Sequence, residues 1–141
     1  MYKAIKAAQY VRLKSLQDSR WIEAMTAQVK RSEYFRWHDA GDVQDLNHLN
    51  KIYEVCRQTP DTKHWMPTRE AWIKDHLDSK PANLVIRFSP PMIGQRNDTW
   101  PNSSMVVTEG ASCPAPSQGG KCGECRQCWD PAVKVVSYGK H

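Results

Sequence analysis

Apolar positions follow two different spacings along the first two thirds of the chain. Trp21, Met25 and Val29 recur at every fourth position, which is the spacing of one face of a helix. Residues 84–86 instead form a continuous apolar run, which is typical of a strand buried on both faces. Helices and strands are therefore expected to alternate, with helices over 2–32, 43–58 and 69–77 and strands over 34–38, 63–67 and 83–88.

This alternation predicts βα units, in which helices connect parallel strands. Residues 89–104 are rich in Pro, Gly and Asn, and two further apolar runs, at 105–108 and 134–138, predict a fourth and a fifth strand. We therefore expect an α/β fold with a small, mostly parallel sheet that resembles part of a barrel. The chain, 1–141, is expected to form one domain, with a helical region at 1–32, a βα core at 33–110, and a Cys-rich metal-binding segment with the last strand at 111–141.

Composition narrows the class of protein further. The 141 residues, of which 40 % are hydrophobic and 25 % charged, are typical of one globular domain. No apolar run approaches the roughly 18 residues that a membrane-spanning helix requires, and the basic N-terminus lacks the apolar core of a secretory signal. We therefore expect a cytoplasmic protein with no membrane partner. The net charge of +5 allows an acidic partner without identifying one.

Four of the five cysteines lie close together, with the spacing Cys113-x8-Cys122-x2-Cys125-x2-Cys128. Their segment is rich in Gly and Pro and has too little apolar surface to fold without a constraint. In a cytoplasmic chain, clustered thiols indicate a metal before disulfides. The C-x2-C-x2-C run is typical of iron–sulfur proteins, so a [4Fe–4S] cluster is the leading hypothesis, zinc is the alternative, and disulfides or free thiols remain open. Cys56 lies on an apolar helical stripe and is expected in the core.

Polar residues follow the predicted strands, at the ends where parallel α/β sheets bind their ligands. His38, Asp39 and Asp42 follow the first strand, and Arg69 follows the second. They predict a polar pocket in which His38 and Asp39 form an acid–base pair, although helix capping also explains Asp42. The Cys-rich segment follows the fourth strand, so we expect it at the same rim. Arg87 lies in an apolar run, and its expected partner is Asp39 or Asp42.

Three stretches of the sequence point to a known family: F-R-W-H-D-A-G-D over 35–42, W-M-P-T-R-E over 65–70, and the late C-x2-C-x2-C-W run. Over 34–141 the chain resembles the phage gene product eighty-eight family. The resemblance implies a phage-encoded protein with a βα scaffold distantly similar to the radical S-adenosylmethionine barrels. Longer members carry an additional Cys cluster near the N-terminus, whereas here no cysteine precedes Cys56 and the C-x3-C-x2-C radical motif is absent. The resemblance therefore implies a shortened scaffold with a metal-binding tail, without radical enzymology.

These observations favour a binding protein over an enzyme. The leading hypothesis is a phage-encoded, metal-binding accessory protein that acts in the host cytoplasm by binding a host or phage macromolecule. One alternative is an enzyme with redox or radical-type chemistry beside the polar pocket, but four cysteine ligands argue against the open metal position that this chemistry requires. The other alternative is a zinc-stabilised module that binds nucleic acid, with an affinity that falls steeply as the salt concentration rises.

Overall fold

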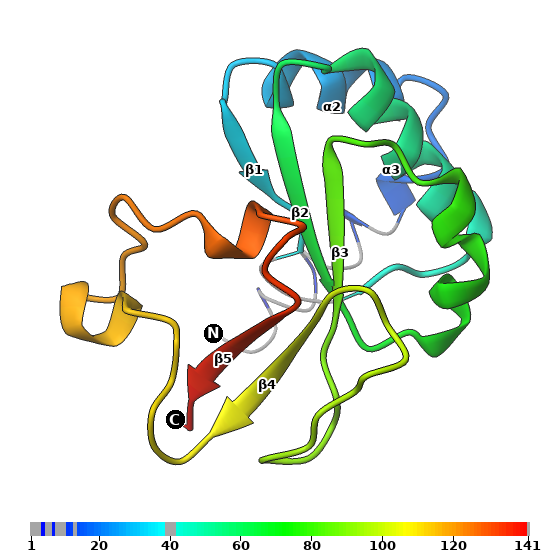
Figure 1. Cartoon of the computed structure of the whole chain (residues 1–141). Helices are drawn as coiled ribbons and strands as arrows, with labels where there is room; N and C mark the ends of the chain where they lie inside the picture. The colour runs from blue at the N-terminus through cyan, green and yellow to red at the C-terminus, as the bar shows by residue number, and fades with distance from the viewer. Residues whose placement is uncertain (1–3, 5–6, 8–10, 13, 39–41, 141) are drawn as a thin grey trace.

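Five parallel strands form the centre of the computed structural model, which describes residues 4, 7, 11–12, 14–38 and 42–140. The strands are β1 (Tyr34–Arg36), β2 (Lys63–Thr68), β3 (Leu84–Phe88), β4 (Ser103–Val107) and β5 (Val135–Gly139). They lie in the order in which they occur along the chain, and every neighbouring pair is parallel. The expected α/β fold, with a parallel sheet that forms part of a barrel, is confirmed (Figure 1).

The sheet is weakly joined between its third and fourth strands. Five residue pairs connect β2 to β3 and five connect β4 to β5, but a single pair, Phe88 with Ser103, connects β3 to β4. In Figure 1, β4 and β5 accordingly diverge from the first three strands. The sheet therefore consists of a three-stranded part and a two-stranded part that meet at the carboxyl end of β3.

The main core lies between the first three strands and the helices. Met66 of β2 and Ile86 of β3 pack with Leu49 and Ile52 in one apolar cluster, and all four side chains are at most 1 % exposed. The helical elements that contribute to this cluster are α2 (Trp21–Val29), α3 (Leu46–Gln58) and the 3-10 helix η1 (Ala71–Ser79). Cys56 of α3 is fully buried in the same cluster, which confirms its expected place in the core.

Three helix predictions differ from the structure at their ends. Residues 16–20 form turns, so the helix expected over 2–32 is interrupted before α2 begins. The helix expected at 43 begins at 46, because the Asp45 carboxylate caps it by accepting a hydrogen bond from the His48 amide at 2.8 Å. The segment expected as an α-helix over 69–77 is the 3-10 helix η1. Its N-cap residue, Glu70, makes no capping bond, since its carboxylate accepts from the Trp72 indole instead.

A buried polar chain crosses the main core. The Trp37 indole N–H donates to Nδ1 of His64 at 3.0 Å, and Nε2 of His64 lies 2.8 Å from the Thr59 hydroxyl, which donates to the Val55 carbonyl. His64 is fully buried. Because Nδ1 accepts a hydrogen bond, the proton of the neutral ring belongs on Nε2, where it is donated to Thr59. Burial lowers the pKa of His64 to about 4, so the ring is neutral at pH 7.

Candidate functional site

The Cys-rich segment runs between β4 and β5 on the face of the sheet opposite the helices. Met66 and Ile86 point toward α3, whereas the alternate residue Trp65 packs with Cys128 and Val136 in a second, smaller cluster. The segment contains two short 3-10 turns, η2 (Ala115–Gln118) and η3 (Gln127–Trp129). Figure 1 shows it in yellow to orange, extending away from the strands before it returns to β5. The first three strands are therefore covered on both faces, by helices on one and by this segment on the other.

A tight turn connects Cys122 and Cys125, two of the last three cysteines of the segment. The Cys125 amide donates to the Cys122 carbonyl at 3.0 Å, and Gly123 between them has a φ of +58°. This left-handed conformation favours glycine, and a Cβ at this position would lie 3.2 Å from the Gln118 side chain. Gln118 in turn donates to the Cys122 carbonyl at 3.0 Å. The geometry of this turn explains why Gly lies between two of the candidate ligands.

The four thiols have different surroundings. Cys128 is 7 % exposed, and its sulfur lies 3.1 Å from the Tyr138 hydroxyl. The Cys125 sulfur accepts a hydrogen bond from the Gln127 amide at 3.2 Å, and Cys122 is exposed. Burial raises the pKa of the Cys128 thiol, while the hydrogen bond with Tyr138 and the charge of Arg87 oppose the shift. All four thiols are free.

The present arrangement does not complete a metal centre. Within the described ranges, which include all four cysteines, no three His, Cys, Asp or Glu side chains are grouped closely enough to hold a metal ion. The donor set itself consists of soft sulfur ligands of the kind that zinc and iron–sulfur clusters select. Ligation by Cys113, Cys122, Cys125 and Cys128 would therefore require the exposed part of the segment to close around the ion.

Arg87 of β3 attaches the end of the segment to the sheet. Its side chain is fully buried, and its guanidinium group donates to six backbone carbonyls at 2.7–3.4 Å. The acceptors are the carbonyls of Gln127, Cys128, Asp130, Val133, Lys134 and Ser103. The expected pairing of Arg87 with Asp42 is wrong, because main-chain carbonyls of the Cys-rich segment and of Ser103 satisfy its donors. Asp39, the other expected partner, lies outside the described residues.

Asp42 instead connects the carboxyl ends of the first two strands. One carboxylate oxygen accepts from the Thr68 hydroxyl at 2.7 Å, and the other accepts from the Arg69 amide at 2.8 Å. The Arg69 side chain itself is exposed. These bonds show that Asp42 fixes the loop after β2, and they explain why it does not cap α3.

His38 lies beside this connection in an unusual conformation. Its φ is +60°, a value that side chains with a Cβ rarely adopt. Its ring lies 5.5 Å from the His48 ring, and its buried Nε2 has no hydrogen-bond partner among the described residues. Burial lowers the pKa of His38, while Asp42 opposes the shift. The structure thus brings His38, Asp42 and Arg69 to one end of the sheet, and Asp39, the expected acid–base partner of His38, lies outside the described residues.

The strand-end cluster and the Cys-rich segment are separate in the part of the chain that the structure describes. Cys125 lines a cavity together with Lys63, which begins β2, and Asn83, which precedes β3. His38, Asp42 and Arg69 lie at the opposite, carboxyl ends of the strands. No described contact joins the two sets, so the structure does not support the expectation of one common rim.

Comparison with protein families gives a match over most of the chain. The family model described as Gene product 88 matches residues 1–107. The chain belongs to the Gene product 88 family. This is a family of phage gene products, as the resemblance implies, but the match covers 1–107 whereas the resemblance in the sequence spans 34–141. No curated protein and no solved structure matches the chain.

The Gene product 88 match ends with the last residue of β4, so the Cys-rich segment and β5 lie beyond it. The family assignment therefore depends on the βα scaffold and leaves the cysteines to be interpreted from their own chemistry. Among the described helices, none is both long enough and apolar enough to cross a bilayer.

Sequence reasoning missed several residues that shape this face of the Gene product 88 fold. Tyr138 of β5, which contacts Cys128, appears in the sequence only as part of an apolar run. Along β2 and β3, Trp65 and Arg87 alternate with residues of the main core, such as Met66 and Ile86, and therefore point to the second face. The sequence does not reveal this second face, because a strand that is buried on both faces has no polar side.

Proposed function

We propose that this phage protein is a metal-binding accessory protein in which Cys113, Cys122, Cys125 and Cys128 hold one inorganic centre, a [4Fe–4S] cluster in preference to zinc. The centre would be mainly structural and would complete the fold of the segment between β4 and β5. The protein would act in the host cytoplasm by binding a host or phage macromolecule. The observation that carries the proposal is the collection of four free thiols on one irregular segment.

The state of the thiols supports metal ligation over a passive role. A buried free cysteine behaves as a small hydrophobe, as Cys56 does. Cys122 is exposed, however, and Cys113 and Cys125 are half-buried, on a segment with little apolar cover. Metal ions bind thiolates, so a cation would favour the ionised form of Cys128, whose thiol pKa is raised by burial. Metal ligation therefore accounts for Cys113, Cys122 and Cys125, whose positions core packing does not explain.

The attachment of the segment supports a structural role for the centre. Arg87 fixes five carbonyls between residues 127 and 134, and the Cys113 amide donates to the Ser137 carbonyl at 3.0 Å. Both ends of the segment are thus held on the sheet, and the residues between them have few contacts with it. Binding of an ion by ligands from both ends would add the constraint that this middle part lacks.

The test is the metal content of protein prepared without oxygen. We expect a brown protein with broad visible absorption that contains four iron and four sulfide per chain, as the [4Fe–4S] formula requires. Colourless protein with one zinc ion per chain would support the four-thiolate centre and reverse the choice of metal. Protein that carries neither metal after growth in medium supplemented with iron and zinc would overturn the proposal.

Matched cysteine variants identify the ligands. Cys125→Ser should abolish the bound metal and make residues 108–126 more sensitive to proteolysis. Cys56→Ala removes a thiol that lies in the main core, and it should leave the metal content unchanged. Equal metal content in the two variants would contradict the assignment of ligands, whatever their stabilities.

A further inference from the structure

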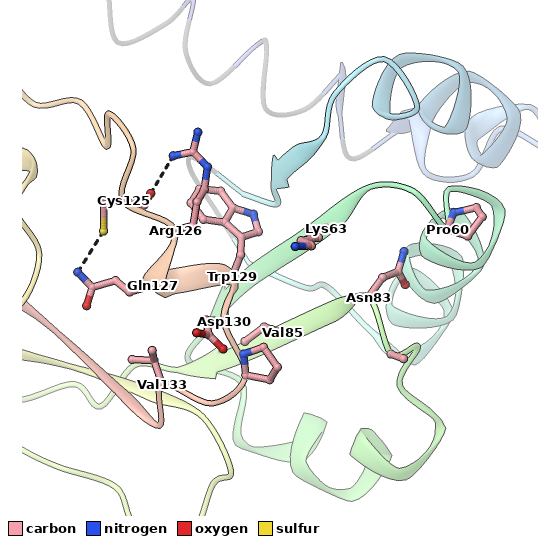
Figure 2. Close-up of a pocket in the computed structure, with 12 residues that line it drawn as sticks. Pro60, Lys63, Asn83, Val85, Cys125, Arg126, Gln127, Trp129, Asp130 and Val133 are labelled. Atoms are coloured by element: carbon pink, nitrogen blue, oxygen red, sulfur yellow. Dashed lines mark hydrogen bonds between the residues drawn. The ribbon is translucent and has the colours of Figure 1, made fainter.

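A cavity of about 840 Å³ lies between the Cys-rich segment and the amino ends of β2 and β3. Its size falls within the range of small-ligand sites, which is roughly 300–1,000 Å³. One wall is formed by residues 125–133, and the other by Lys63, Asn83 and Val85 (Figure 2). Arg87 and Trp129 hold the first wall on the sheet, together with the packing of Cys128 against Trp65. The wall is therefore fixed by contacts of the fold other than metal ligation.

Two cations stand at one side of this cavity, around the ring of Tyr34. The Lys63 ammonium lies 5.5 Å from the ring centre, and the Arg126 guanidinium lies 4.6 Å from it. Both side chains are exposed, and neither is paired with a carboxylate from the described residues. Two positive charges that converge without a counter-ion favour an anionic ligand.

The hydrogen bonds of Arg126 leave donors available. One of its terminal nitrogens donates to the carbonyls of Gly123 and Cys125, at 2.7 and 2.8 Å. These bonds fix the planar group beside the cavity, and its remaining N–H groups make no bond to the described part of the chain. Fixed guanidinium donors match the oxygens of a phosphate. Asp130, the single acidic residue of the described lining, accepts a hydrogen bond from the Ala132 amide at 2.9 Å.

An aromatic side chain with a fixed orientation lines the same side. The Trp129 indole N–H donates to the Phe35 carbonyl at 3.0 Å, and the ring makes T-shaped contacts with Tyr34 and Trp65, at 5.5 and 5.3 Å. The Arg126 guanidinium lies 5.9 Å from the centre of the same ring. Figure 2 shows this indole beside Arg126, and the close contacts of Lys63 and Trp129 with Tyr34 place all three in one group. The apolar side chain of Val85, which is 4 % exposed, lines the cavity as well.

We propose that this cavity binds a nucleoside phosphate unit. The base would lie against Trp129, and the phosphate would lie between Lys63 and Arg126. Stacking on a rigid aromatic ring next to a cationic group is the general means by which proteins bind nucleotides without reading their sequence. The unit can be a free nucleotide or part of a single strand, since the chemistry of recognition is the same. This inference goes beyond the metal-binding proposal and does not rest on it.

The test is calorimetric titration of the full chain with three probes: adenosine monophosphate, inorganic phosphate and a short oligothymidylate. We expect the nucleotide to bind more tightly than phosphate, since the ring adds a contact. An oligonucleotide that binds far more tightly than the mononucleotide identifies a strand as the source, and equal affinities identify a free nucleotide. Absence of nucleotide binding at millimolar concentration, or equal binding of phosphate and nucleotide, would overturn the proposal.

Exposed charge variants test the position of the site. Lys63→Gln and Arg126→Gln should each weaken nucleotide binding about tenfold, since each removes a charged hydrogen-bond donor. Lys74→Gln makes the same change at an exposed residue of η1, outside the cavity lining, and should leave the affinity within about twofold. An equal loss in Lys63→Gln and Lys74→Gln would show that net charge alone attracts the ligand. Metal content measured on the same samples separates this result from the fate of the metal-binding proposal.

Discussion

The attachment of the Cys-rich segment by Arg87 gives a prediction of large magnitude. In Arg87→Met, a fully buried guanidinium that donates to six carbonyls is replaced by a side chain without donors. A hydrogen bond from a charged group contributes about 1.5–3 kcal/mol to the free energy of unfolding. The six contributions are not additive, because water can reach some of the carbonyls once the segment loosens. Loss of one side of a buried charged network typically costs about 3–5 kcal/mol. We expect a decrease of this size in the free energy of unfolding.

The assay combines a global and a local measurement. Urea unfolding followed by circular dichroism gives the free energy, and pulsed alkylation with mass spectrometry gives the reactivity of each thiol, with a chelator present so that no metal contributes. Arg87→Met should expose Cys128 to alkylation while Cys56 remains protected. The matched control is Arg96→Met, which removes an exposed ion pair with Asp98 and should cost less than about 1 kcal/mol. If both variants lose equally little and Cys128 remains unreactive, Arg87 does not attach the segment.

Three further predictions concern the βα scaffold. Burial lowers the pKa of His64 to about 4, below its value of about 6.5 in an unfolded chain. The free energy of unfolding should therefore have its full value above about pH 6.5 and decrease by roughly 3 kcal/mol as the pH falls toward 4. His64→Gln, which can accept from Trp37 and donate to Thr59, should make urea midpoints depend less on pH; an unchanged dependence would contradict this assignment. Asp45→Ala, measured by urea unfolding, should lose about 1 kcal/mol with the cap of α3, whereas Asp75→Ala, at an exposed position, should lose none. Asp42→Asn should lose about 1–3 kcal/mol in the same assay, because an amide N–H₂ would face the Thr68 hydroxyl or the Arg69 amide donor; an effect no larger than that of Asp98→Asn would refute the connecting role of Asp42.

The sequence predicted the architecture well where local pattern and burial agree. The run at 84–86 and the four-residue spacing from Trp21 to Val29 identified a buried strand and a helix correctly. The ends of the elements were less predictable. Asp42 and Asp45 are both good capping residues, and only the position of Thr68, 26 residues away from Asp42, decides which of them caps α3.

The candidate site was predictable in its chemistry but not in its position. The cysteine spacing identified four thiols as one group, whereas the face of the sheet on which they lie depends on long-range contacts. Arg87 illustrates the reason. Its need for acceptors could be predicted from its apolar neighbours, but backbone carbonyls carry no sequence signal, so a carboxylate was the natural expectation. The cavity beside Trp129 was equally hidden, because it forms between segments about 45 residues apart, from 83–85 to 125–133.

The single residue pair between β3 and β4 divides the protein into two units of unequal stability. The first three strands share the larger apolar cluster with the helices, whereas β5 contributes to a cluster with three buried members. Besides the single residue pair, the two units are connected by the hydrogen bonds of Arg87 and by the small cluster of Trp65, Cys128 and Val136, and units with such limited connections can open separately. Hydrogen exchange from β4 and β5 should therefore proceed through a partly unfolded state in which β1 to β3 remain native.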